Sequence, residues 1–446
     1  MRGAHRPETG PAQDLAERMA QFALQAVPSE AALEMTRLCL FDWSLCAVAG
    51  ASQPVARILR AQAEAEGGAA QSSLIGSPAL RVPPRAAALA NGATSHALDY
   101  DDTHLGAVVH TSVAVLPAAL AVAERQGASG DDLLRAAAIG AETAIRVAQW
   151  LGPEPAAQGF HPTAIGGALG ASVAAGLMCG LDAEQMVRAL AIASTRAAGI
   201  QAVFGSMAKP LNAGGAAAAG VLAADLAGAG LTAPADALDG PQGFGHAHGG
   251  TAEAEALHGL GTTWHVEAIS FKFHACCHGL HAMLEAVSEL SLAPQQIDRV
   301  TVRTHPRWRG VCDRAAPTTG LEAKFSFRFA AALALAGRDT GALESFSAEA
   351  CADPRLTALR DRVDVVFDDS LPISAAMVDV TASGGRAHRV THDLSRPVPP
   401  ARLRARLDAK AQLLLGDEGA AALAAATRGA VPDLAALTAE LRHAQG

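Results

Sequence analysis

Acidic and histidine side chains are concentrated in HALDYDDTHLGAVVHTS, residues 96–112. Carboxylates this close together raise one another's pKa unless a cation, a metal ion or hydrogen-bond donors compensate. Three interpretations are open: a divalent-metal site on the D-x-x-D spacing of Asp99 and Asp102, a polar turn between helices, and an acid/base loop. We favour the acid/base loop, in which Asp99 and Thr103 orient groups and His110 moves a proton, because imidazole titrates near neutral pH.

The metal interpretation has little support elsewhere in the chain. A metal-dependent diphosphate enzyme needs a second acidic cluster, and the helical part of the sequence has none. Aromatic residues, which would line a carbocation pocket, are only 4% of the chain. We therefore predict no metal ion here. Capping and local hydrogen bonding account for Asp101, Asp102 and His104.

A lone lysine marks a second segment, FGSMAKPLNAGGAAAAG, residues 204–220. Lys209 is the only lysine before residue 271, and its neighbours are apolar or small. The P-loop pattern GxxxxGK[ST] is absent. A surface lysine is one interpretation. The alternative is a turn at Pro210 that leads into a helix, where lysine and a helix N-terminus together receive a carboxylate.

A third segment is ISFKFHACCHGLHAMLEA, residues 269–286. Lys272 and His274 stand two apart in a strand-like stretch, which would place them on one face. Cys277 and His281 have helical i, i+4 spacing, but vicinal cysteines do not fit a usual zinc knuckle, so buried cysteines at a strand–helix junction are the better interpretation. A fourth, weaker signal is His161, followed by proline before a glycine-rich helix; it suits a ligand contact or a cap.

The elements that must position these segments are mainly helices up to about residue 260. Helical spacing of apolar residues, with Ser29 as N-cap, Gly127 as C-terminal glycine and a capping box at Asp182 and Gln185, predicts helices over 14–27, 29–50, 113–127, 131–152, 164–180, 182–199 and 214–230. The helices over 164–180 and 214–230 consist mostly of small residues, which allow close backbone packing.

The pattern changes near Thr262. Alternation predicts strands over 265–272, 297–306, 362–369 and 377–393, the last with a hairpin turn at Ser383-Gly384-Gly385, and a helix over 279–290. Helical periodicity returns after the proline-rich link 396–400. The predicted fold is mainly α with an inserted α+β part: a helical domain of residues 1–261 and 396–446, and a smaller α+β lid domain of residues 262–395.

Composition limits the function classes. Half of the 446 residues are hydrophobic and 18% are charged, which favours a large packed core over disorder. The net charge of −9 argues against a nucleic-acid platform. The seven cysteines form no CxxC pair or regular framework, and the stretch MRGAHRPETGPAQDL has no apolar core of a signal sequence. We expect a cytoplasmic protein that binds a small molecule and spans no membrane.

Taken together, the segments resemble the MmgE/PrpD family. The matching stretches, in chain order, are HALDYDDTH with the later HTS, GFHPTAIGGALGA, GSMAKPLNAG, GPQGF, SFKFHACCHGLHA and KFSFRFAAALAL. The family includes 2-methylcitrate dehydratase, cis-aconitate decarboxylase and iminodisuccinate epimerase. The resemblance implies a helical domain with a lid, a homodimer, no cofactor and a carboxylate substrate.

The family's catalytic pattern is carried over onto Asp99, Thr103, His110, Lys209 and Lys272. Reactions of this family move or remove a group beside a carboxylate, which needs cations around the developing negative charge and a base near the proton. The lysines would supply the cations and His110 the base. The residues expected to bind substrate are His161, Asn212, His278 and Phe329.

Three departures from the family pattern affect the expected specificity. Asn212 stands where many members have histidine, and His278 where an arginine often binds a carboxylate. Phe329 ends Ser-Phe-Arg-Phe, where an SLPY-like segment has tyrosine, so no hydroxyl is available there. We expect a lyase of dehydratase type, with an epimerase of an iminodisuccinate-like dicarboxylate as the alternative and a decarboxylase of cis-aconitate type ranked lower.

Overall fold

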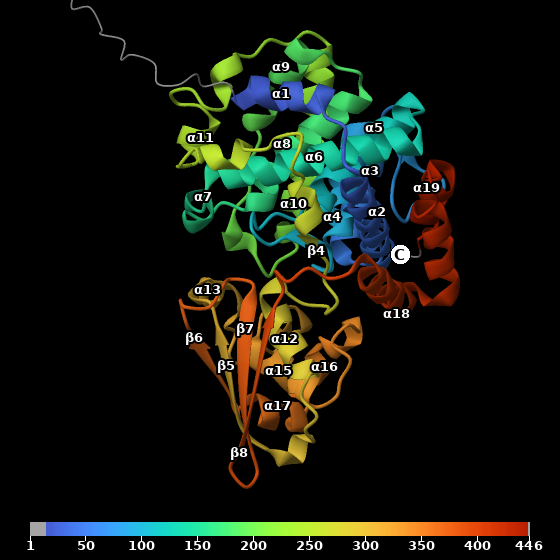
Figure 1. Ribbon diagram of the computed structural model, residues 1–446. Coiled ribbons are helices and arrows are strands. Elements are labelled where there is room, and N and C mark those ends of the chain that lie inside the picture. The colour runs from blue at the N-terminus through green and yellow to red at the C-terminus, as the bar shows by residue number, and fades with distance from the viewer. Residues whose placement is uncertain (1–14, 445–446) are drawn as a thin grey trace, which may run out of the picture.

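The computed structural model describes residues 15–444 (Figure 1). Residues 1–14, which hold nearly all of the stretch searched for a signal sequence and the start of the predicted helical domain, lie outside the described part, as do residues 445–446.

Helices fill the first 250 described residues and form the upper part of the molecule in Figure 1. They are α1 (Leu15–Gln25), α2 (Glu30–Gly50), α3 (Pro54–Glu66), α4 (Pro84–Ser95), α5 (Ser112–Gln126), α6 (Gly130–Leu151), α7 (Glu154–Ala157), α8 (Pro162–Met178), α9 (Ala183–Ser194), α10 (Ala208–Gly228) and α11 (Phe244–Ala247). Short strands β1 (Ser72–Ser73) and β2 (Arg81–Val82) pair between α3 and α4.

The helix ends follow the sequence signals. Ser29 caps α2, and Asp182 with Gln185 forms the capping box of α9. Gly127 after α5 has φ +65°, the left-handed conformation that glycine adopts at little cost. These three predictions are confirmed.

Small residues bring helices close together, as the sequence predicts. A Cβ placed on Gly170 of α8 would lie 2.4 Å from the main-chain oxygen of Gly140 in α6. A Cβ on Gly220 of α10 would lie 2.5 Å from the carbonyl carbon of Ala171 in α8. Any larger residue at these crossings would force the helices apart, so the α6–α8–α10 layer depends on glycine.

The lid is a four-stranded mixed sheet with helices beside it, drawn below the helical layer in Figure 1. Its strand order is β6-β5-β7-β8, with β5 and β6 parallel and the other pairs antiparallel. The strands are β5 (Ile297–Thr304), β6 (Val363–Phe367), β7 (Ala375–Ala382) and β8 (Arg386–Asp393); the helices are α12 (His281–Ser288), α13 (Arg309–Cys312), α14 (Gly320–Ala323), α15 (Phe327–Leu335), α16 (Ala348–Ala352) and α17 (Pro354–Arg360).

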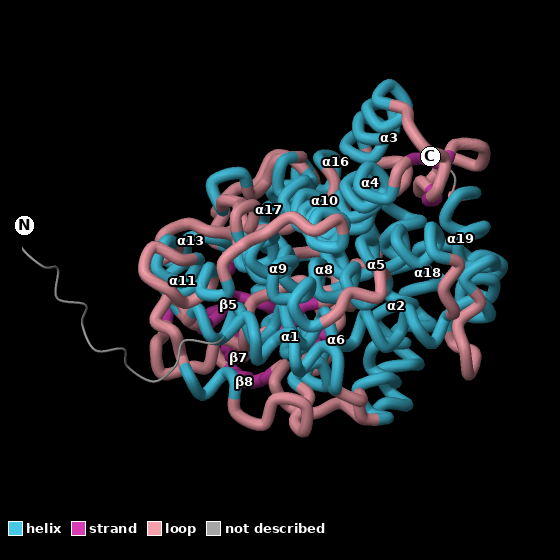
Figure 2. Tube along the Cα trace, turned by 90° about the horizontal axis from the view of Figure 1, so that it is seen from above, coloured by secondary structure: helices cyan, strands magenta, loops and turns pink. Residues whose placement is uncertain are grey.

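The chain then returns to the helical layer. Helices α18 (Pro400–Thr427) and α19 (Leu434–His443) pack beside α2 (Figures 1 and 2). Gly416 interrupts α18 with φ +70°, at the glycine where the sequence pattern breaks. One apolar core cluster contains residues from 15–271 and 403–444, and the second consists chiefly of residues from 275–380.

The predicted fold class, mainly α with an inserted α+β part, is confirmed. Two local expectations are wrong. The stretch 265–272 contains only the short strand β4 (Ile269–Ser270) after a 3-10 turn, so Lys272 and His274 do not share a strand face. Lys209 and Pro210 lie inside the first turn of α10 and not in a turn before it, because proline is tolerated there without a hydrogen-bond partner.

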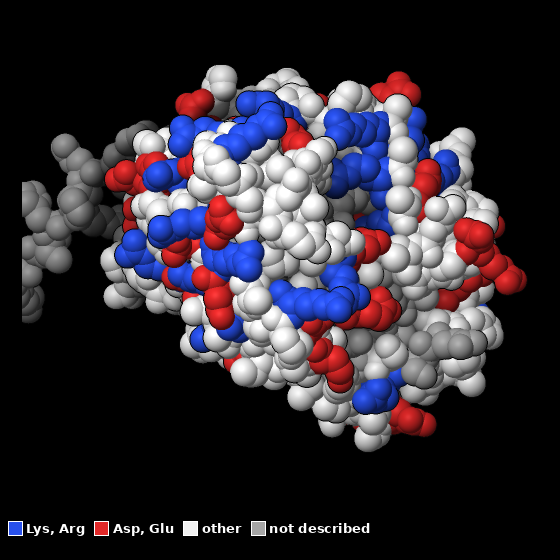
Figure 3. All heavy atoms as spheres, turned by 90° about the horizontal axis from the view of Figure 1, so that it is seen from below, with Lys and Arg blue, Asp and Glu red and all other residues white. Residues whose placement is uncertain are grey.

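Half of the arginines of the lid form ion pairs with carboxylates. Arginines of the sheet form ion pairs such as Arg299–Asp364 and Arg389–Asp379. The lower face of the molecule shows basic and acidic side chains interspersed (Figure 3). Among the described helices, none is both long and apolar enough to cross a bilayer.

Candidate active site

Seven of the nine predicted site residues line one cavity of about 450 Å³. Residues of both the helical part and the lid contribute to its wall. The seven are Asp99, Thr103, His110, His161, Lys209, Lys272 and His278. A larger depression of about 670 Å³ beside α9 and α11 contains none of them, so we place the chemistry in the smaller cavity.

A short strand pair brings two of the sequence segments together. Strand β3 (Thr103–His104) pairs antiparallel with β4, with Thr103 opposite Ser270. This pairing fixes the loop after α4 against the segment that carries Lys272. The first turn of α10 brings Lys209 to the same place.

Asp99 is the centre of an ion cluster. Its Oδ1 lies 2.7 Å from Nζ of both Lys209 and Lys272, and the Nζ of Lys272 also donates to the main-chain oxygen of Asp99 at 2.8 Å. Asp99 has φ +53°, a left-handed conformation that aspartate tolerates better than most residues. The bend directs both its carboxylate and its carbonyl toward Lys272.

Within this cluster, Asp99 and Lys272 stabilise each other in their charged forms. Burial alone would raise the pKa of Asp99, but Lys209 and Lys272 hold it well below its usual value. Burial opposes the charge on Lys272 as well, and Asp99 outweighs that effect and raises the Lys272 pKa. An ammonium group has three donors, so the contacts to Asp99 leave one on Lys272 and two on Lys209 for a ligand. The Oδ2 atom of Asp99 is buried without a hydrogen-bond partner among the described residues.

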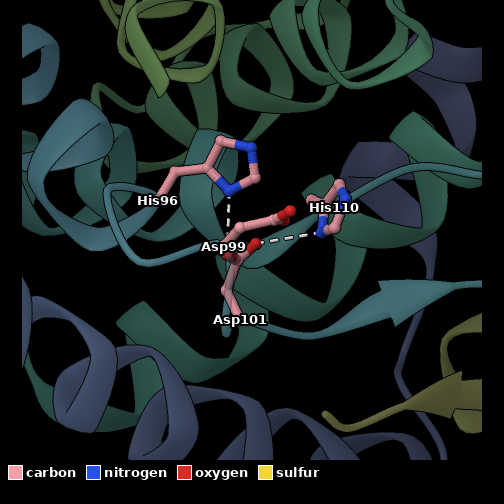
Figure 4. A group of neighbouring side chains, drawn as sticks. All are labelled: His96, Asp99, Asp101 and His110. Carbon is pink, nitrogen blue, oxygen red and sulfur yellow. Dashed lines mark hydrogen bonds and ion pairs between the residues drawn. The ribbon is translucent and has the colours of Figure 1, made fainter. Parts of the chain in front are cut away.

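The structure adds two residues for which sequence reasoning found no role, Asp101 and His96. Asp101 is fully buried between two imidazole rings (Figure 4). Its Oδ1 lies 2.8 Å from Nδ1 of His96, and its Oδ2 lies 3.0 Å from Nδ1 of His110. Burial opposes its charge, yet His96 and His110 hold the pKa of Asp101 well below normal. The repeated carboxylate–histidine spacing in residues 96–110 was the available signal.

His110 is held as a neutral base. Its Nδ1 donates to the main-chain oxygen of Asp102 at 2.7 Å and also faces Asp101 and the hydroxyl of Thr103, which lies 3.1 Å away. With the proton on Nδ1, the lone pair is on Nε2. Burial and, secondarily, Lys272 lower the pKa of His110 to about 4, so the ring is neutral at pH 7.

His161 carries the opposite tautomer. The side-chain amide of Asn212 donates to Nδ1 of His161 at 3.2 Å, which places the ring proton on Nε2. Burial and then His96 lower the pKa of His161 well below normal, so this ring is also neutral. Asn212 itself does not line the cavity; it acts through His161 and not, as predicted, as a substrate contact.

The remaining predicted residues differ in position. His278 lines the cavity, and its Nε2 lies 3.3 Å from the hydroxyl of Ser270. Phe329 is fully buried in α15 within the lid core, so it cannot contact a ligand in this structure and its prediction as a substrate-binding residue is wrong. Asp102 also faces away: it bonds the hydroxyl of Ser112, and burial raises its pKa to about 7. The D-x-x-D pair therefore does not converge.

All four lysines of the chain, among 35 basic residues, meet at residues 98–100. Lys209 and Lys272 bind Asp99 as described, Nζ of Lys324 donates to the oxygen of Leu98 at 2.9 Å, and Nζ of Lys410 donates to the oxygen of Tyr100 at 2.7 Å. A compact ammonium fits such a buried space better than a guanidinium. The scarcity of lysine was thus a signal for Lys324 and Lys410, and sequence reasoning used it only for Lys209.

Replacement of Lys410 by methionine is expected to lower the free energy of unfolding by about 3–5 kcal/mol, because it leaves the buried Asp42 carboxylate, 2.6 Å from Nζ, without its partner. It also removes the donor to Tyr100 and should reduce kcat. Urea unfolding and turnover measure the two effects.

The double variant Lys410→Met/Asp42→Leu separates the effect on stability from the effect on kcat. It should recover most of the stability while kcat stays low, because the oxygen of Tyr100 still lacks its donor. Recovery of both would show that Lys410 serves stability alone.

Four side chains have the geometry of a metal site. Ligand atoms of His96, Asp99, Asp101 and His110 lie within 4.8 Å of one another. Two ammonium groups already bind Asp99 Oδ1, and a third cation beside them is electrostatically disfavoured. Within residues 15–444 the alternative pair Cys277 and His281 belongs to no such group.

Dialysis against EDTA is therefore expected to leave turnover of a carboxylate substrate unchanged. Metal analysis of the dialysed protein, together with its kcat, tests this expectation. A loss of activity that a divalent cation restores would contradict it.

Comparisons with known proteins agree with this arrangement. The MmgE/PrpD N-terminal domain matches residues 13–257, and the MmgE/PrpD C-terminal domain matches residues 274–427. Cis-aconitate decarboxylase of Aspergillus terreus is 32% identical over 300 residues, which are 64% of this chain and 60% of that protein. The Homo sapiens enzyme of the same name is 32% identical over 319 residues, 68% of this chain and 65% of that one. The match thus spans less than two thirds of each relative.

The two domain matches together extend over most of the sequence, and they include Asp99, His110, His161, Lys209 and His278 of the cavity, whereas Lys272 lies in the short gap between them. The chain belongs to the MmgE/PrpD family.

Proposed function

We propose that the protein is a lyase that acts on a small di- or tricarboxylate by proton transfer at a carbon next to a carboxylate. The observation that carries the proposal is the pair of neutral histidines with opposite tautomers, His110 and His161, beside the free donors of Lys209 and Lys272. The chain's own groups supply each step, so the proposed reaction uses no cofactor.

The lysine donors would bind the substrate carboxylate and stabilise the negative charge that develops on it when the adjacent carbon becomes a carbanion. Nε2 of His110, with its lone pair, would accept a proton. Nε2–H of His161 would donate one. Asp101 and Asp102 keep the His110 proton on Nδ1 and so act as positioning residues.

Among lyase reactions we place decarboxylation first. The relatives found are cis-aconitate decarboxylases, and loss of carbon dioxide needs only a proton for the carbon left behind, which His161 can give. Dehydration, the expectation from sequence, also needs an acid for the departing hydroxyl. Phe329 supplies no hydroxyl for that step, whereas the carbanion left by decarboxylation is basic enough to take its proton from His161, which burial keeps neutral.

Epimerisation is the second candidate, and the same two histidines favour it. A base on one face of a carbon and a proton donor on the other exchange a hydrogen without net loss of a group. His110 would take the proton at Nε2 and become an imidazolium, and His161 would return one from Nε2 and become an imidazolate. A proton passed from His110 to His161 through water then restores both neutral rings.

Proton NMR of candidate acids in D₂O distinguishes these reactions. Incubation of cis-aconitate with the protein is expected to give a decarboxylated alkene with one deuterium at the protonated carbon. Loss of water from a citrate-type acid would indicate a dehydratase, and exchange without conversion an epimerase. If no di- or tricarboxylate exchanges or converts, the proposal is wrong.

A further inference from the structure

A second cavity adjoins the first. It has a volume of about 270 Å³ and shares five lining residues with the active-site cavity: Val108, Pro153, Ala156, Pro162 and Arg307. Most of its other lining residues are small or apolar, among them Ala107, Ala148, Leu151 and Ile165. We call this second space the annex and the five shared residues the neck.

The neck contains a strained residue. Val108 has φ +54°, a conformation that a β-branched side chain adopts only at a cost. It lies within the acid/base loop, between Thr103 and His110, and its neighbour Val109 pairs with His104 through main-chain hydrogen bonds. The strain is therefore held in place by the structure around it, at the point where the two cavities meet.

The neck also contains a cation without a protein partner. Arg307 of the lid is half-buried, and among residues 15–444 no carboxylate lies within 4.0 Å of its guanidinium. Some other arginines of the lid do have carboxylate partners, such as Arg328 with Asp313. A guanidinium of this kind is suited to bind a ligand carboxylate in bidentate fashion, and its planar face tolerates apolar contact.

The apolar character extends from the neck into the main cavity. Trp308, Val311 and Ile373 of the lid and Leu105 and Ala157 of the helical part line the main cavity together with its lysines and histidines. A short polyanion such as citrate has no group that would use this surface or the annex. The two cavities together therefore fit a ligand with one charged end and one apolar arm.

We propose that the substrate is a di- or tricarboxylate that carries an alkyl arm of several carbons, with its head at Lys209 and Lys272, a second carboxylate on Arg307 and the arm in the annex. The inference rests on the proposed function and specifies its substrate class. Val108 and Ala156 set the width of the neck and so determine specificity.

Isothermal titration calorimetry with saturated succinates tests the inference without turnover. The series is succinate, 2-methylsuccinate, 2-butylsuccinate and 2-hexylsuccinate. Affinity is expected to rise about threefold to fourfold for each methylene that enters the annex, the gain typical of burying one CH₂ group. An affinity that is flat or falls with chain length, or no binding by any member, would overturn the inference.

Two variants test whether the alkyl arm of the ligand lies in the annex. Ala156→Phe narrows the neck and is expected to reduce the preference for 2-hexylsuccinate over succinate to below threefold. Gln158→Phe adds the same ring two residues later, at the C-terminal end of α7 and outside both cavities, and should keep the full preference. If Ala156→Phe also keeps it, the arm does not occupy the annex.

Arg307→Gln tests the second carboxylate. Binding of 2-hexylsuccinate should weaken at least tenfold, as expected for loss of a charged hydrogen bond, whereas binding of octanoate, which has a single carboxylate, should not change. Equal effects on both ligands would remove Arg307 from the site.

The outcomes separate this inference from the proposed function. A flat series together with turnover of short acids overturns the annex and leaves the lyase standing. Chain-length dependence without proton exchange or conversion of any acid supports the annex and overturns the lyase.

Discussion

Replacement of Lys272 by methionine is expected to lower kcat about 10³-fold, because it removes a cation from the carbon-acid site and the group that orients Asp99. Loss of one preorganised donor to a developing charge costs about 10²–10³ in kcat. The same change leaves a buried carboxylate with one partner in place of two and should lower the free energy of unfolding by about 3 kcal/mol. Turnover in the NMR assay and urea unfolding measure the two effects.

The double variant Lys272→Met/Asp99→Asn is the matched control. It removes the unbalanced charge, so stability should return toward that of the parent protein while kcat stays low. Lys209→Ala and His110→Ala should also abolish turnover with the fold intact. If two of these three single variants keep near-normal kcat, the catalytic assignment fails.

Mild acid is expected to destabilise the protein strongly. Burial, aided for His104 by His265 and for His110 chiefly by Lys272, lowers the pKa of each to about 4. His161, His278 and His281 shift in the same direction. Because these groups bind more protons when the chain is unfolded, their stability is fully present above pH 6.5 and is lost as pH falls toward 4.

The size of the effect follows from the shifts. Between pH 7 and pH 5, each histidine with a pKa of about 4 costs about 2 kcal/mol of stability. The pKa of Asp102 is raised to about 7, so its contribution to stability grows as pH falls from 7 to 5. This gain offsets the loss from about one of the histidines. His104, His110 and Asp102 together leave a loss of about 2 kcal/mol, to which His161, His278 and His281 add in the same direction, against a typical total stability of about 5–15 kcal/mol. The melting temperature measured at pH 7, 6 and 5 should therefore fall steeply.

The variant His104→Asn tests whether a buried histidine causes the loss of stability in mild acid. The asparagine oxygen can accept the hydrogen bond that Nδ1 of His104 receives from the Ala107 amide, but it does not titrate. The variant should lose less stability between pH 7 and pH 5 than the parent. His258→Asn, at a side chain that is 83% exposed, should change nothing. Equal acid sensitivity in all three proteins would exclude buried histidines as the cause.

The fold was predictable where the sequence pattern is local. Caps such as Ser29 and the glycine after α5 mark helix ends by their own chemistry, and the alternation of β5 and β7 follows from one buried face. Apolar and polar residues alternate equally well over 265–272. In the fold, however, this stretch has only the two-residue strand β3 to pair with. The periodicity of apolar residues in a segment does not show which other strand it pairs with in the fold.

The site was predictable in its residue types and only partly in their roles. Lys209, Lys272 and His110 were found because each is an unusual residue in its segment. Asp101 was given no role because a carboxylate next to Asp102 and two positions from Asp99 is readily explained by capping, and only the folded loop brings His96 and His110 to it. Phe329 was misplaced because alignment with a motif gives a position in the chain and not the direction of a side chain.

The scarcity of lysine has a practical consequence. Within residues 15–444 every primary amine lies close to residues 98–100; Lys209, Lys272 and Lys410 are buried and Lys324 is half-buried. Amine-selective labels and crosslinkers should therefore find almost no target on the folded surface of that region. Acylation at the half-buried Lys324 competes with the hydrogen bond that it makes from the lid to the oxygen of Leu98, so its rate, read by mass spectrometry, should rise when the lid leaves the loop.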